Sequence, residues 1–115
     1  ATNMIQQGVK VIFVPTDNLV ASSMANLTAI TDKAKVPVFV ADDNLLKSGG
    51  LMGYTVDYYK LGVQAGQMAA DILDGKSKPE DMAIQSQPTM KLAVNKDALQ
   101  RLGITLPADL PQEAK

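Results

Sequence analysis

Three groups of polar side chains stand at the ends of apolar segments, where a folded chain could use them to bind a ligand. The groups are Thr16-Asp17-Asn18, Asp42-Asp43-Asn44, and Thr55 with Asp57. Each group could instead cap a following helix, because Asp, Asn and Thr are common residues at helix N-termini. The adjacent carboxylates of Asp42 and Asp43 exceed what one cap requires, and their mutual repulsion favours a cationic partner or a solvated position.

The apolar segments before these groups have the character of strands. Residues 9–15 form a run rich in β-branched side chains, which predicts a strand buried on both faces, as in a parallel sheet. Residues 36–41 and 51–56 are the next two strand candidates. Ligands of open α/β sheets bind beyond the carboxyl ends of the strands. If the three strands are parallel, their polar groups therefore converge on one edge.

Helical periodicity separates these strands. Apolar side chains recur three, four or seven residues apart from Leu19 to Ala34, which predicts a helix there. The clearest helix follows Asp57 and ends before Gly75, a residue suited to a left-handed stop. Residues 82–95 predict one or two short strands broken by Pro88, and residues 96–103 predict a short helix before an extended tail. The alternation predicts an α/β domain with a mostly parallel sheet.

Two further features lie near the third group. The glycine-rich stretch from Ser48 to Gly53 could form a tight turn, or could bring backbone N–H groups close to a ligand carboxylate. The tyrosines are Tyr54, Tyr58 and Tyr59. They could pack against the sheet with their hydroxyls at its edge, or form the wall of a pocket for an aromatic ligand.

Composition excludes several kinds of chemistry. The chain has 115 residues, 46% of them hydrophobic and 20% charged, which is typical of one globular domain. It has no Cys and no His, so it offers no thiol nucleophile, no imidazole base and no usual zinc site. The net charge of −1 gives no reason to expect nucleic acid as a partner. We expect no cofactor and no bound metal.

The segments "VIFVPTDNLVASSM", "AKVPVFVADD", "GYTVDYYKLGVQAGQMAADILDGKSKPEDM" and "KLAVNKDALQRLGITLP" resemble the C-terminal half of bacterial ABC-transporter substrate-binding proteins, in the family that includes tryptophan-binding members. The resemblance implies the type I periplasmic-binding-protein fold, in which two α/β lobes hold a ligand between them. Residues 1–115 would form a three-layer C-terminal lobe, with a hinge or return segment at about 77–95 and a final helix and tail at 96–115. An N-terminal lobe would be missing.

The resemblance also implies the binding residues. Ligand contacts are expected from Thr16, Asp17 and Asn18, from Asp42 or Asp43, and from Asp57, with Tyr54 as part of an aromatic wall. Acidic side chains suit an amino group, whereas hydroxyls and amides suit a carboxylate. The implied ligand is a small amino-acid-like molecule, possibly an aromatic one. The implied partner is an ABC permease, and the implied location is the periplasm or a lipoprotein at the cell surface.

Two other functions remain open from the residues. One is the effector-binding domain of a transcription regulator, which shares the two-lobed architecture and would carry a DNA-binding headpiece upstream. The other is a Mg²⁺-dependent enzyme with Asp17, Asp42 and Asp43 as metal ligands at strand ends. The sequence lacks a convincing set of Lys and Ser or Thr residues to accompany such a metal site, and we therefore expect a binding protein without catalytic activity.

Overall fold

The computed structural model of this chain describes residues 1–87 and 90–110. Its residues group into two compact units. The first unit contains residues 1–55 and the segment from Lys91 onward, and the second contains Val56–Met90. The predicted assignment of the whole chain to one lobe, with a return segment at 77–95, stays a prediction.

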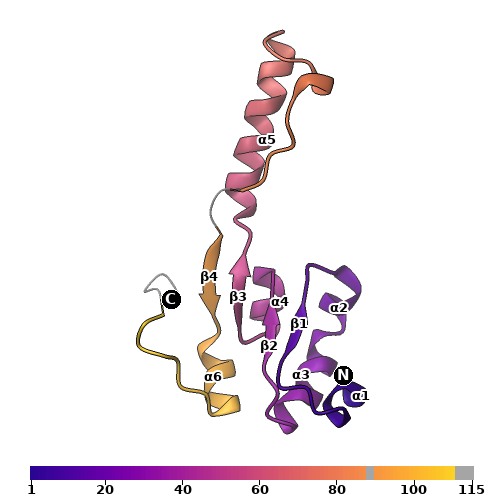
Figure 1. Cartoon of the computed structure of the whole chain (residues 1–115), viewed down its shortest axis with the longest axis vertical. Coiled ribbons are helices and arrows are strands. Elements are labelled where there is room, and N and C mark those ends of the chain that lie inside the picture. The colour runs from indigo at the N-terminus through magenta and orange to yellow at the C-terminus, as the bar shows by residue number, and fades with distance from the viewer. Residues whose placement is uncertain (88–89, 111–115) are drawn as a thin grey trace. The chain divides into compact units, whose positions relative to one another are not determined.

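The first unit is built on a four-stranded sheet (Figure 1). Its strands are β1 (Ile12–Val14), β2 (Val38–Val40), β3 (Met52–Thr55) and β4 (Lys91–Val94), and they are ordered β1-β2-β3-β4. The first three strands run parallel, and β4 runs antiparallel to β3. The mostly parallel α/β sheet expected from the sequence is therefore confirmed.

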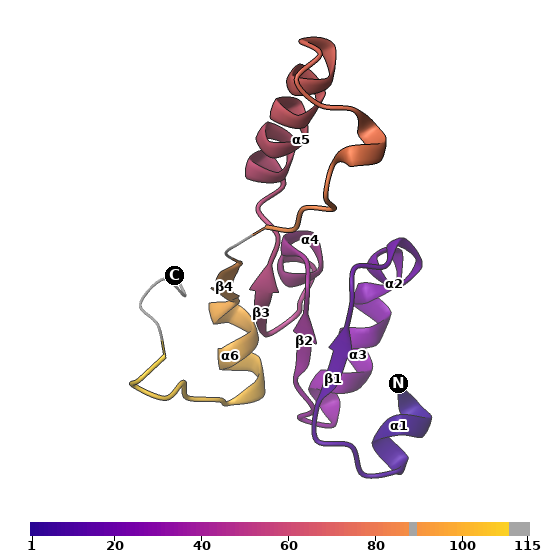
Figure 2. The same ribbon diagram turned by 45° about the horizontal axis from the view of Figure 1, so that its top comes forward.

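Helices lie on both faces of this sheet, as Figure 2 shows. The helices of the first unit are α1 (Thr2–Gln6), α2 (Asn18–Ser22), α3 (Met24–Lys33), α4 (Asp43–Lys47) and α6 (Lys96–Leu102). Residues of α3 and α4 pack with β1 and β2 in one core, whereas α6 packs with Phe39 and Met52 in a second core. The unit thus has three layers.

The two faces of the sheet are covered unequally. Ile12 and Val14 are buried against α3 and α4, but Phe13, which points to the opposite face of the pleated strand, is 63% exposed. Phe13 lies in register with Phe39, and Phe39 with Met52, which are both partly buried by α6. The helix covers the middle of this face and leaves the edge strand open. The expectation that the first strand is buried on both faces is therefore wrong for this chain.

Several predicted elements differ in extent. The helix expected from Leu19 to Ala34 is two helices, because the chain leaves helical geometry at Ser23 with φ −108° and ψ 8°. The helix α4 follows the Asp42-Asp43-Asn44 group, for which the sequence offered helix capping as an alternative, although no apolar periodicity predicted a helix there. Residues 82–87 form no strand, and Pro88, where a break was expected, lies outside the described residues. The helix predicted at 96–103 is present as α6 and ends at Gly103, which has a φ of 70°.

The second unit consists of α5 (Tyr58–Leu73), a short 3-10 helix η1 (Pro79–Asp81) and the extended segments around them. The turn after α5 contains Gly75 with a φ of 72°, which confirms the predicted left-handed stop. The returning segment then bonds to α5 through side chains, since the Gln64 amide donates to Gln85 Oε1 at 2.7 Å. No residue of α5 is buried.

The glycines of the 48–53 stretch make close backbone packing possible. A Cβ atom on Gly53 would overlap the carbonyl oxygen of Val40, in the neighbouring strand β2. A Cβ atom on Gly49, which has a φ of 118°, would lie 2.8 Å from the Thr28 side chain. The sequence left two roles open for this stretch, a tight turn or an approach of its N–H groups to a ligand carboxylate. These contacts support the tight turn.

Gly53→Ala should destabilise the first unit by about 3 kcal/mol or more, because the added methyl group collides with backbone that cannot rotate away. Chemical denaturation followed by circular dichroism measures this. Gly62→Ala is the control. Gly62 lies in α5, and a Cβ atom added there would meet no other atom within 4 Å. We expect the control to raise helix stability by about 0.5–1 kcal/mol. Equal stability of Gly53→Ala and the unmodified chain would contradict the described packing.

Candidate ligand-binding site

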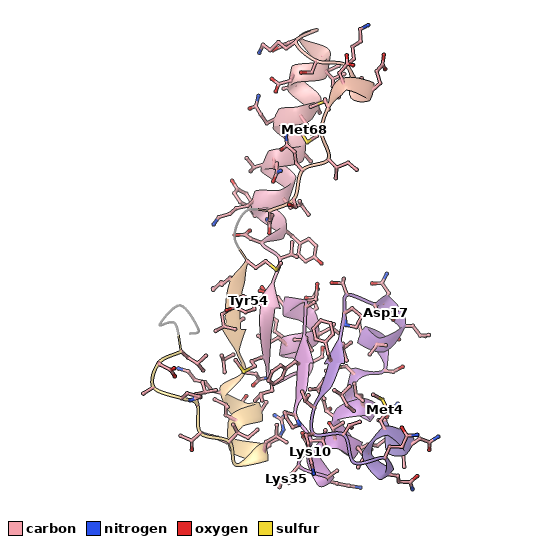
Figure 3. The ribbon with its side chains drawn as sticks, viewed as in Figure 1. Met4, Lys10, Asp17, Lys35, Tyr54 and Met68 are labelled. Carbon is pink, nitrogen blue, oxygen red and sulfur yellow. The ribbon has the colours of Figure 1, made fainter. Side chains whose placement is uncertain are left out.

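Two of the predicted polar groups lie at the same edge of the first unit's sheet. Thr16, Asp17 and Asn18 come just after β1, and Asp42 and Asp43 just after β2. The two strands are parallel neighbours, and their pairing continues past the strand ends, where the Ala41 N–H donates to the Val14 carbonyl at 3.2 Å. Figure 3 shows Asp17 at this carboxyl edge. The convergence expected for these two groups is present in the fold.

Asp17 combines helix capping with exposure. Its backbone is extended, with φ −147° and ψ 122°, and its Oδ1 accepts the Val20 N–H at 2.8 Å at the start of α2. Thr16, Asp17 and Asn18 are all exposed in this chain. The cap holds the Asp17 carboxylate in one orientation at the sheet edge while its side chain remains accessible.

The two neighbouring acids after β2 have different surroundings. Asp42 is only 6% exposed, and its Oδ1 accepts the N–H groups of Asn44 at 2.7 Å and Leu45 at 3.4 Å. It is the N-cap of α4. Asp43 is exposed in the first turn of that helix, where a negative charge is favourable. The Asp42 carboxylate is therefore enclosed by the protein, whereas Asp43 is exposed to solvent.

Tyr54 and Asp57 belong to different units. Tyr54 lies in β3 opposite Leu92, is 58% exposed, and shares a sheet face with Met52. Asp57 is the N-cap of α5 in the second unit. Its Oδ1 accepts the Lys60 N–H at 3.1 Å, and its Oδ2 lies 3.7 Å from the Lys60 ammonium. Tyr54 thus stands near the carboxyl end of the parallel strands (Figure 3), whereas Asp57 is fixed within its own unit.

Tyr58 and Tyr59, the other two tyrosines, begin α5. They are 52% and 82% exposed. Neither tyrosine ring is buried in a core of this chain, so the alternative in which both pack against the sheet receives no support from their exposure.

Sequence reasoning missed one residue that bonds directly to a predicted binding residue. The Gln87 side chain bonds to both backbone polar groups of Asp57, at 3.1 Å and 2.6 Å. The two residues are thirty positions apart. A glutamine in a nonperiodic segment carries no sequence signal for such a contact, because the partner depends on how the chain returns.

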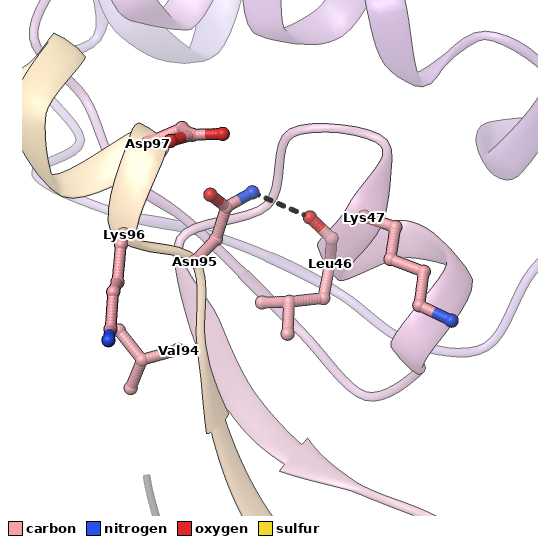
Figure 4. A pocket seen from close by; sticks show the side chains of 6 residues that line it. All are labelled: Leu46, Lys47, Val94, Asn95, Lys96 and Asp97. Carbon is pink, nitrogen blue, oxygen red and sulfur yellow. Dashed lines mark hydrogen bonds between the residues drawn. The ribbon is translucent and has the colours of Figure 1, made fainter. Parts of the chain in front are cut away.

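Two shallow depressions lie at the other end of the first unit's sheet. One of about 360 Å³ is lined by Leu46, Lys47 and the 94–97 segment, where the Asn95 amide donates to the Leu46 carbonyl at 2.9 Å (Figure 4). The other, of about 400 Å³, includes the Arg101–Asp32 ion pair, whose charged atoms are 2.9 Å apart. None of the predicted binding residues lines either depression.

Within residues 1–87 and 90–110, no group of three or more acidic side chains is arranged to hold a metal ion. The same part of the chain contains no helix with the length and apolar character needed to cross a bilayer.

The whole chain matches one protein family. The sequence profile described as "ABC transporter substrate binding protein" covers residues 1–115. The mostly parallel α/β fold of the chain is similar to that of a solved substrate-binding protein, at a TM-score of 0.71. The chain belongs to the family of ABC transporter substrate-binding proteins.

The chain is also similar to individual proteins, among them one curated relative and two solved structures. A "Tyrosine-binding protein" of Clostridioides difficile (strain R20291) is 34% identical over 94 residues, which are 82% of this chain and 27% of that protein. A Streptococcus pneumoniae ABC domain solved in complex with L-Trp has a TM-score of 0.81 and 32% identity, covering 96% of this chain and 37% of that one. A ligand-free, open substrate-binding protein with adhesive properties from Clostridium difficile has a TM-score of 0.71 and 35% identity, covering 96% and 39%. The chain therefore spans between about a quarter and two-fifths of these relatives' lengths.

The neighbouring acids after β2 offer a matched test of capping. Asp42→Ala should lower the free energy of unfolding by about 1–2 kcal/mol, because two N–H groups at the start of α4 lose their acceptor. Asp43→Ala should change it by no more than about 0.5 kcal/mol, because Asp43 is exposed. Urea denaturation of both variants measures the difference. Equal effects would contradict the assignment of Asp42 as the structural acid.

Proposed function

We propose that this chain is part of the solute-binding component of an ABC importer, which binds an aromatic amino acid between two lobes. The observation that carries the proposal is the pair of polar groups after β1 and β2, which share one edge of a parallel sheet. Support comes from relatives named for tyrosine binding or solved with L-Trp, which are 34% and 32% identical to the chain.

The group after β1 has the chemistry that an amino-acid head group requires. Asp17 uses Oδ1 for the cap of α2, and no contact described in this structure occupies its Oδ2. A carboxylate held in this way is suited to the ligand ammonium, because charge-assisted hydrogen bonds are the stronger ones. The hydroxyl of Thr16 and the amide of Asn18, both exposed beside it, are suited to the ligand carboxylate.

The polar groups after β1 and β2 could surround only part of a bound ligand. Drug-sized and metabolite-sized ligands are commonly buried over most of their surface in their sites. The residues after β1 are exposed in this chain, so a second surface is needed to exclude water. We assign that surface to a further α/β lobe of the same protein. Closure of two lobes about a hinge would then trap the ligand.

The exposure of helix α5 is a separate argument that this chain is part of a larger protein. It is sixteen residues long and carries the apolar stripe Leu61, Ala65, Met68 and Ile72, yet none of its residues is buried. Helices of this kind are normally stabilised by packing of their apolar side. The small residues Gly62 and Gly66 lie one turn apart, and added Cβ atoms there would meet nothing within 4 Å. Such a surface admits close packing, and the missing lobe is its proposed partner.

The remaining parts of the proposal are supported by membership of the family. The protein would act outside the cytoplasmic membrane, as a periplasmic protein or a lipoprotein, and would deliver its ligand to an ABC permease. It would bind its ligand without transforming it, with no cofactor. Titration calorimetry of the full-length protein with the common L-amino acids tests the proposal. Selective binding of L-tryptophan or L-tyrosine is expected, and binding of no aromatic amino acid would overturn the proposal.

Asp17→Asn should weaken binding of the preferred amino acid by at least about tenfold, because the charge is lost while an amide oxygen still accepts the Val20 N–H. Asp97→Asn is the control, because Asp97 lines a depression at the other end of the sheet. Calorimetric titration and thermal melts are measured together. An unchanged dissociation constant for Asp17→Asn would restrict Asp17 to its capping role.

Tyr54→Ala should reduce the affinity for an aromatic amino acid more than the affinity for leucine, whereas Tyr54→Phe should retain most of it. Ring–ring contacts contribute about 0.5–1.5 kcal/mol beyond buried area, which corresponds to a two- to tenfold change in affinity. Competition titrations with L-tryptophan and L-leucine give the ratio. Identical losses for both ligands would remove Tyr54 from the aromatic wall.

A further inference from the structure

Strand β1 forms one edge of the first unit's sheet, because no further strand of the described residues lies beyond it (Figure 1). Its inner side is bonded: the Ile12 N–H donates to the Pro37 carbonyl at 3.0 Å, and the Val14 carbonyl accepts a bond of 3.2 Å from the segment after β2. Backbone groups of successive residues point to opposite sides of a strand. The N–H and C=O of Phe13, between these two residues, therefore point to the outer edge.

Phe13 is also uncovered on one face of the sheet. Ile12 and Val14 are 5% and 4% exposed on the opposite face, whereas Phe13 is 63% exposed. On the Phe13 face, helix α6 packs with Phe39 and Met52 of the next two strands. Parallel sheets are normally covered by helices on both faces. Phe13 thus presents an apolar ring and two backbone polar groups at one corner of the sheet.

The helices that join the parallel strands show which chain segment fits this corner. Residues of α3, between β1 and β2, and of α4, between β2 and β3, share the core on the face opposite Phe13, and Ile5 of α1 packs against the same core. Crossovers between parallel strands are nearly always right-handed, so helices on one face accompany strands that are added in one direction. The observed order from β1 to β3 follows this rule. A parallel strand joined to β1 through α1 would therefore lie beyond the outer edge of β1.

We propose that the outer edge of β1 and the Phe13 ring bind a parallel strand and a helix that belong to the same protein but lie outside residues 1–115. The strand bonds to the Phe13 backbone, and the helix covers its ring. The chain covers 37% and 39% of two solved relatives, so more than half of each relative lies outside the matched part. The inference goes beyond the proposed function, because it concerns this sheet and no ligand. It differs from the expectation that residues 1–115 form a whole lobe.

A second copy of the chain fits the corner less well. β1 is three residues long, so two copies of this strand would form few bonds with each other. Stable interfaces between proteins typically bury about 1,200–2,000 Å². A strand and helix of the same polypeptide do not need so large an area, because the covalent connection keeps them near the edge.

Amide hydrogen exchange of the unmodified full-length protein, followed by NMR without ligand, tests the strand pairing. The Phe13 N–H should exchange about a hundredfold more slowly than an unstructured amide, and within about tenfold of the Ile12 N–H, which is bonded in this structure. Unprotected exchange at Phe13 beside slow exchange at Ile12 would overturn the inference. A full-length protein that binds no aromatic amino acid would overturn the proposed function and leave this measurement decisive.

Thermal melts of full-length variants test whether the ring is covered. Phe13→Thr should lower the melting temperature by about 4 °C or more, and Ile30→Gln, on α3, by less than about 2 °C. Thr is favoured in strands and Gln in helices, so neither change opposes the local backbone. In this chain Phe13 is 63% and Ile30 39% exposed, which alone would predict the opposite ranking. A shift for Phe13→Thr no larger than that for Ile30→Gln would overturn the inference.

Photocrosslinking identifies the segment that covers Phe13. Benzoylphenylalanine placed at position 13 of the full-length protein should crosslink within one molecule to a peptide outside residues 1–115, which mass spectrometry would locate. A crosslink between two molecules would assign the edge to a second copy and overturn the inference. Crosslinks confined to residues 1–115 of the same molecule would overturn it as well, because a segment described here would then cover the ring.

Discussion

The first N–H groups of a helix have no partner within that helix, and this requirement organises the polar residues of the chain. Asp17, Asp42 and Asp57 each follow or lie near the end of a strand, and each accepts a backbone N–H at the start of the next helix. Asn95 does the same after β4, where its Oδ1 accepts the Ala98 N–H at 3.1 Å. Every strand of the described sheet is thus followed by a capping side chain, which starts the next helix at a defined residue.

A carboxylate that caps a helix is lost to ligand binding only where it is also buried. An exposed capping carboxylate can still accept bonds from a ligand. Asp42 is enclosed by the protein and bonds to two N–H groups, so its main contribution is to the stability of α4. Asp17 makes a single described bond through Oδ1 and is exposed. A cap of this kind costs the ligand site little, because a carboxylate has two oxygens and about four acceptor positions. It also reduces the rotamer freedom that binding would otherwise have to restrict.

The sequence predicted the features that depend on local pattern. Strand positions, the mostly parallel sheet and the stop at Gly75 follow from apolar periodicity and backbone preference, which act over a few residues. The break at Ser23 was not predictable in this way, because the apolar spacing continues through it. The exposure of Phe13 depends on how far α6 reaches across the sheet, and the partner of Gln87 depends on the path of the returning segment. Both are tertiary effects that no local pattern encodes.

The proposed binding residues depend both on local sequence pattern and on tertiary contacts. Local pattern places Asp17 and Asp57 at strand ends, and the capping bonds direct their carboxylates. The backbone of Asp57 is held in addition by a contact that is distant in sequence, because the Gln87 side chain bonds to it at 3.1 Å and 2.6 Å. Precise positioning of first contacts by residues behind them is a general requirement of binding sites. The side chains that sequence inspection finds first are therefore held partly by residues that it does not find.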